Sequence, residues 1–116
     1  MTEGKTTIAP EVLRSIIRLA AININGVSKL INPPGNVNRI FQRNTTEGVK
    51  IEILDDTVYA DVFVIIHANE NIREVSQNIQ FEVARSISDI VGMKTGKINI
   101  HVEDIDYNIK EEVQPK

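Results

Sequence analysis

The residues best suited to chemistry in this sequence are two histidines. His67 ends an expected strand, and His101 lies in the middle of another. Each stands apart from any second histidine, and the chain has no cysteine. A metal site usually needs three or four ligands. We therefore expect strand-end or surface roles for both histidines, and we predict no catalytic residue and no metal site.

Carboxylates form two short clusters, Asp55–Asp56 and the EDID run at 103–106. Carboxylate oxygens bind hard cations, but the calcium-loop pattern with its central glycine and closing glutamate is missing here. A weak cation site therefore requires that the two clusters meet in space. Otherwise we expect solvated acidic ends of strands.

Phosphate-binding motifs of the GxxxxGK[ST] or GxGxxG type do not occur in the chain. The GMKTG stretch at 92–96 has two glycines, but it follows an expected helix. Its amides are therefore not aimed at a phosphate by a helix N-terminus. We interpret it as a helix stop, and we expect no cofactor.

A basic set around an Asn-rich loop supports an alternative function, RNA binding through the loop 29–50. Small α+β domains bind single strands by charge and by stacking on aromatic side chains. The net charge of −3 argues against this alternative. The possible nucleic-acid contacts are Lys29, Arg39, Arg43 and Lys50, with Phe41 among them.

The composition is that of a soluble globular domain, with 116 residues, 41% hydrophobic and 25% charged. We expect one domain over residues 4–107 and a flexible C-terminal tail over 108–116. No apolar run approaches the length of about 18 residues that would span a membrane. Membrane association would therefore come through another molecule or a weak surface contact.

Hydrophobic periodicity predicts an α+β fold. We expect two layers, with two main helices packed on one face of a mixed, mostly antiparallel sheet. Asp55–Asp56 is a tight-turn signal that joins two of the strands into a hairpin. The expected strands are 5–8, 27–31, 49–54, 57–67 and 97–105, and the expected helices are 9–21, a short one at 37–43, and one within 71–93 that Gly92 stops.

The second long helix carries an aromatic residue that its periodicity does not explain. Phe81 lies opposite the expected buried stripe and next to a strip of low charge formed by Gln77, Ala84 and Ser88. A single exposed apolar residue is common, but aromatic residues contribute strongly to interfaces. We interpret this strip as a protein-interaction surface. The expected buried stripe is Ile72, Val75, Ile79, Val83, Ile87 and Ile90.

A second apolar surface is expected on the long strand 57–67. If both helices pack on the face that carries Val62 and Val64, then Phe63 and Ile65 on the other face need cover. One solution is that the short segment 37–41 folds over them. The other is a second subunit or a partner protein, so Phe63 and Ile65 are also candidate interaction residues.

An ordered set of short motifs resembles the alkaline-shock protein family, small cell-envelope stress-response proteins of Gram-positive-type bacteria. The resemblance covers about residues 4–107. The chain departs from the pattern at 32–46, which is rich in Asn and Pro, and it lacks the extended charged tails of some members. The matching residues are Gly4, Ile8, Glu11, Val12, Ile16, Ala20 and Ala21 near the start, then Gly26-Val27, Gly48-Val49-Lys50-Ile51, Asn71-Ile72, Glu74-Val75, Ile79-Gln80, Val83, Gly92-Met93 and the run from Ile98 to Ile105.

The resemblance implies a non-enzymatic protein, because the family is not known for a catalytic activity. It implies a cytoplasmic interaction or scaffold module linked to envelope stress or homeostasis. Its partners would be other proteins, such as a membrane-anchored relative or a lipid-metabolism enzyme, and a homo-oligomer is possible. Any membrane location would be peripheral, through a partner, without direct insertion.

Overall fold

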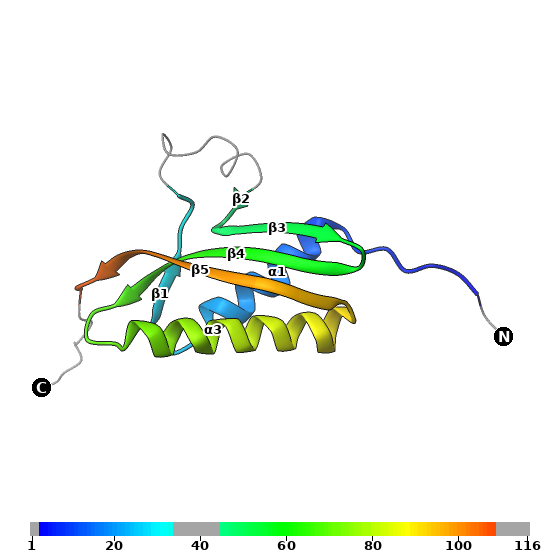
Figure 1. Cartoon of the computed structure of the whole chain (residues 1–116). Helices are drawn as coiled ribbons and strands as arrows, with labels where there is room; N and C mark the ends of the chain where they lie inside the picture. The colour runs from blue at the N-terminus through cyan, green and yellow to red at the C-terminus, as the bar shows by residue number, and fades with distance from the viewer. Residues whose placement is uncertain (1–2, 34–44, 109–116) are drawn as a thin grey trace, which may run out of the picture.

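The computed structural model describes residues 3–33 and 45–108 (Figure 1). The order of elements confirms the α+β prediction. The short strand expected at 5–8 does not form, and the short helix expected at 37–43 lies outside the described residues. The elements are α1 (Pro10–Ile22), β1 (Val27–Leu30), β2 (Thr45–Thr46), β3 (Val49–Leu54), β4 (Thr57–His67), α3 (Ile72–Ser86), the π-helical turn η1 (Ile87–Val91) and β5 (Lys94–Asp106).

The strand β4 is the centre of a five-stranded mixed sheet. It pairs antiparallel with β1 and β3, and β3 pairs antiparallel with β2. On its other edge β4 pairs in parallel with β5 along its whole length (Figure 1). The expected hairpin is confirmed, since Asp55 and Asp56 form its two-residue turn at φ 51° and 64°.

The strands β1 and β3 share one edge of β4 and meet at Phe63. The backbone N–H of Phe63 donates to the carbonyl of Gly48, and its carbonyl accepts from the N–H of Ile31. Gly48 has φ 81°, and a Cβ atom there would lie 2.9 Å from Leu30 Cβ and 3.1 Å from the Phe63 carbonyl oxygen. This junction therefore requires glycine on grounds of both conformation and space.

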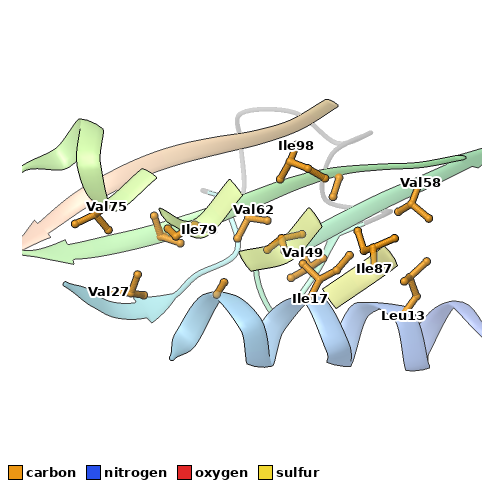
Figure 2. Packing of buried hydrophobic residues seen from close by; sticks show 14 of the residues in the cluster. Leu13, Ile17, Val27, Val49, Val58, Val62, Val75, Ile79, Ile87 and Ile98 are labelled. Atoms are coloured by element: carbon orange, nitrogen blue, oxygen red, sulfur yellow. The ribbon is translucent and has the colours of Figure 1, made fainter. Parts of the chain in front are cut away.

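The core lies between the sheet and the two helices. Leu13 and Ile17 point from α1 toward Val58 and Val62 of β4 (Figure 2). From α3, Val75, Ile79 and Val83 join the same cluster, and α1 and α3 also contact each other. Burial of these side chains is the main favourable term that holds the two layers together.

Two residues of the expected helical stripe are not buried. Ile72 is 44% exposed because it is the first residue of α3, and Ile90 is 67% exposed. At regular pitch Ile90 would return to the stripe seven residues after Val83. Instead the N–H of Gly92 donates to the carbonyl of Ile87, five residues back, and this wider turn rotates Ile90 away from the core.

Candidate functional site

The outer face of α3 presents the exposed aromatic side chain that the sequence predicts. Asn71 begins the helix, and its side-chain oxygen accepts the N–H of Glu74 at 2.9 Å. Val75 and Ile79 hold the inner side against the core. Phe81 therefore faces outward and is 67% exposed. This position on a packed, capped helix gives Phe81 a rigid base.

The strip around Phe81 is less uniform than the sequence indicates. Gln77 is exposed, Ala84 is half-buried, and Ser88 is exposed but lies in the π-helical turn. Arg85, four residues after Phe81, shares its side of the helix. The outer face of α3 therefore combines one aromatic ring with a cation.

Two carboxylates hold the Arg85 guanidinium in place. Glu82 accepts hydrogen bonds from Arg85, and a carboxylate oxygen of Asp89 lies 3.7 Å from a guanidinium nitrogen of Arg85. The hydrogen bond from Arg85 lowers the pKa of Glu82, and the same bond raises the pKa of Arg85. Arg85 is exposed and Glu82 is half-buried at the surface of the helix, so solvent screens the pair and its effect on stability is small.

Phe63 and Ile65, the second predicted interaction surface, are buried in the chain. Their side chains are 3% and 8% exposed, so neither offers a free surface to a partner. The ring of Phe63 stacks on His101, with centroids 4.5 Å apart and planes 14° from parallel. Phe63 and Ile65 are therefore covered, as the sequence requires. The segment 37–41, which was one expected cover, lies outside the described residues.

A polar cluster on the outer face of the sheet was not predicted from the sequence. The Asp61 carboxylate contacts His101 Nε2 at 2.8 Å and accepts from the Asn99 amide at 3.1 Å. Lys50 Nζ lies 4.0 Å from the same carboxylate. The hairpin turn predicts that Lys50 faces Asp61, but the contact with His101 depends on the parallel register of β4 and β5. His101 is therefore not a lone histidine.

His67 lies near a serine and an aspartate, but in an order that does not suit nucleophilic catalysis. The Ser28 hydroxyl donates to Asp106 at 2.6 Å, and His67 Nδ1 lies 3.9 Å from the same carboxylate. In a catalytic triad the histidine stands between the hydroxyl and the acid. Here the carboxylate stands between them, so the arrangement holds β1, β4 and β5 together.

The two acidic clusters do not meet. Asp55–Asp56 precede the first residue of β4, and residues 104–106 pair with its last three residues. The 11-residue strand between them separates the clusters by ~30 Å at a rise of about 3.3 Å per residue. The cation site that would join them is therefore excluded. Residues 3–33 and 45–108 also hold no group of three His, Asp or Glu side chains close enough to share a metal ion.

The basic set predicted for RNA is described in part. Lys29 is exposed and lines a cleft of about 270 Å³ with Asp104 and Asp106, and Lys50 lies near Asp61. These acidic neighbours weaken the attraction of both lysines for a polyanion. Arg39 and Arg43 lie outside the described residues, so RNA binding stays a prediction.

A family model matches residues 1–107, and its description is that of the alkaline-shock protein 23 family, with a "cell envelope-related function". The chain belongs to this alkaline-shock protein family. The match confirms the resemblance drawn from the sequence and its expected extent. No helix in the described parts of this alkaline-shock family chain has the length and apolar character needed to cross a membrane.

Similar relatives in curated sequences come from two bacteria. "Uncharacterized protein YqhY" of Bacillus subtilis (strain 168) is 31% identical over 114 residues, which cover 96% of this chain and 84% of the relative. "Uncharacterized protein Spy1535" of Streptococcus pyogenes serotype M6 is 30% identical over 103 residues, which cover 88% of this chain and 79% of the relative.

Among solved structures, this alkaline-shock family chain is similar in fold to "MamM CTD - Copper form". The TM-score is 0.60 at 14% identity, with 92% of this chain and 96% of the other covered. At this identity the likeness shows the fold alone. It supports the two-layer arrangement of helices on one face of a sheet.

Proposed function

We propose that this protein is a non-enzymatic interaction module of the cell envelope response, with its contact surface on the outer face of α3. The observation that carries the proposal is the exposure of Phe81, at 67% of its surface. An aromatic side chain on a rigid helix adds contact area at a low entropic cost. The description of the family as cell envelope-related supports the setting.

The neighbours of Phe81 indicate the chemistry of the partner. Arg85 is held by Glu82 and Asp89 and keeps 53% of its side chain exposed. Aromatic residues and arginine are the residue types enriched where binding energy concentrates at protein interfaces. The partner is therefore a protein with an apolar pocket for Phe81 and an acceptor near Arg85.

A scaffold role without catalysis agrees with the contacts of both histidines. His101 is held by Asp61, and His67 faces the carboxylate that Ser28 already contacts. A membrane-anchored relative or a lipid-metabolism enzyme is the partner class that fits an envelope role. The protein would then lie at the membrane through that partner, within the cytoplasm.

The test is a quantitative pull-down from the native host, comparing wild type with Phe81→Ser. We expect membrane or lipid-pathway proteins with the wild type and their loss with the variant. Leu19→Ser is the matched control, because Leu19 is also an exposed helical residue, 54% exposed on α1. This control should retain the same proteins.

Two results would contradict the proposal. One is the same set of proteins with wild type and Phe81→Ser. The other is a large loss of thermal stability in Phe81→Ser, because an exposed residue should change the free energy of unfolding by no more than about 0.5 kcal/mol.

A further inference from the structure

The outer edge of β5 is the longest strand edge of the sheet that lacks a described partner. β5 has 13 residues and pairs through its other edge with β4. No strand within residues 3–33 and 45–108 pairs with the outer edge. A typical strand has about five or six residues, and a long edge of unpaired N–H and C=O groups is a template for a further strand.

The charges along β5 are sorted by sign. Lys94 and Lys97 lie in its first part, and Glu103, Asp104 and Asp106 lie in its last part. The middle, residues 98–102, has no lysine, arginine or carboxylate. Strand edges that avoid pairing carry charge, especially lysine, against an approaching strand. The edge of β5 has its charges at the two ends instead, with opposite signs.

We propose that β5 pairs antiparallel with β5 of a second copy, about a two-fold axis near Ile100. Antiparallel pairing brings the basic end of each strand to the acidic end of the other. Residues 98–102 pair regularly with β4, and Lys97 and Glu103 flank this segment at the two register shifts of β5. In the antiparallel pairing each of them therefore lies at the end of the segment beside the opposite charge of the second copy. A two-fold interface of this kind repeats every favourable pair.

The direction of the backbone groups agrees with this register. The carbonyl of Ile98 accepts a hydrogen bond from the Gln80 side chain at 2.9 Å, so it points away from β4. Alternation along the strand gives Ile100 the same direction. In the proposed pairing Ile98 and Ile100 thus present their edge groups to the second copy. A backbone N–H of that copy takes the place of the Gln80 amide.

The side chains on the inner side of β5 also gain cover. Ile100 and Val102 pack on the core but stay partly exposed, since no described strand lies beyond them. In the proposed register Ile98 faces Val102 of the second copy. The apolar layer under the sheet then continues from one protomer into the other. This surface is separate from the outer face of α3, so the inference does not depend on the proposed function.

The experiment measures the self-association of the full chain by sedimentation velocity at rising protein concentration. We expect a dimer for the wild type. Lys97→Glu and Glu103→Lys should each raise the Kd of the dimer by roughly tenfold, since two symmetry-related pairs turn from attraction into repulsion. Glu52→Lys is the matched control, because Glu52 is exposed on β3, away from β5, and it should leave the dimer unchanged.

A mixture of the two variants gives the sharpest result. The Lys97→Glu chain is acidic at both positions and the Glu103→Lys chain is basic at both, so the mixture should form a heterodimer. The double variant should regain the wild-type Kd. Circular dichroism checks that each variant is folded.

The proposal is overturned if the wild type stays monomeric at every concentration, or if its dimer resists both charge reversals. It is also overturned if the single substitution Phe81→Ser dissociates the dimer, because the interface would then lie on α3. If Phe81→Ser loses the host proteins in the pull-down but keeps the dimer, the result supports two separate surfaces, one on the outer face of α3 and one on the outer edge of β5.

Discussion

The two faces of β4 hold residues of different kinds, although they alternate along the same eleven residues. The inner face, under the helices, is apolar throughout and at most 1% exposed. The outer face mixes aromatic, aliphatic and ionisable side chains. The inner residues are Val58, Ala60, Val62, Val64 and Ile66, and the outer residues are Tyr59, Asp61, Phe63, Ile65 and His67.

The difference shows that the two faces are stabilised in different ways. The inner face depends on burial, which has no direction and scales with the apolar area removed from water. The outer face depends on particular neighbours, such as Asp61 with His101 and Phe63 with the ring of His101. We therefore expect large, nonspecific losses from inner substitutions and small, pair-dependent losses from outer ones.

The largest effect should come from Ile66→Ala, which breaks the inner face. Ile66 is 0% exposed, and its truncation leaves a cavity in a packed core. We expect a loss of about 4 kcal/mol in the free energy of unfolding. Ile65→Ala, one residue earlier, should cost about 2 kcal/mol, because Ile65 lines a cleft where water can replace the lost atoms.

Chemical denaturation of both variants measures the two losses in the free energy of unfolding. The matched residue type and adjacent positions leave the face of the strand as the main difference. Equal losses at Ile65 and Ile66 would show that the outer face is packed as tightly as the inner one.

The next effect should come from Gly48→Ala, at the junction where β1 and β3 meet beside Phe63. The added Cβ meets Leu30 and the Phe63 carbonyl, and φ 81° is unfavourable for alanine. We expect a loss of about 2–3 kcal/mol, measured as a shift in the denaturation midpoint. Gly92→Ala is the control for conformation alone. Gly92 has φ 79° with no atom within 4 Å of its added Cβ, so its loss should be smaller.

Asp61→Asn should have a smaller effect, because it changes only the contacts of one carboxylate on the outer face. The amide oxygen can still accept a hydrogen bond, but the charge near Lys50 and His101 is lost. We expect a loss of about 1 kcal/mol in the free energy of unfolding. Asp55→Asn in the exposed turn is the control, since asparagine also adopts φ 51° readily. A loss above that of Gly48→Ala would contradict this ranking.

The smallest effect concerns Glu82 and Arg85 on the outer side of α3. The folded chain lowers the pKa of Glu82, so this pair stabilises the fold above the ordinary glutamate pKa. The contribution disappears as the pH falls through the lowered value. In Arg85→Gln the Glu82 pKa should rise toward its ordinary value, as carboxyl NMR titration would measure. An unchanged pKa would show that the pair does not persist in solution.

Local patterns predicted most of the fold. Alternation gave the bounds of β3 and β4, and the Asp55–Asp56 turn gave their register. Helical spacing placed Val75, Ile79 and Val83 inward and Phe81 outward. These features depend on residues near one another in the chain, where the period of the structure directly determines which side chains share a face.

Features that depend on distant segments were not predictable. The contact of Asp61 with His101 requires the parallel register of β4 and β5, which no local turn sets. The exposure of Ile90 is a local feature that was also missed, because it follows from a π-helical turn that hydrophobic spacing does not reveal. The cover over Phe63 and Ile65 likewise depends on tertiary packing, so the sequence left open whether the chain itself or a partner buries them.

The position of β5 in the chain has a consequence for biosynthesis. β4 is complete at His67, but its parallel partner follows only after α3 and ends at Asp106. During translation, the growing chain therefore displays one edge of this eleven-residue strand, whose inner face is apolar, until residue 106 has left the ribosome. Such long-range pairing folds slowly and leaves nascent chains open to aggregation. Chaperones that bind extended apolar segments should therefore recognise the nascent chain through β4.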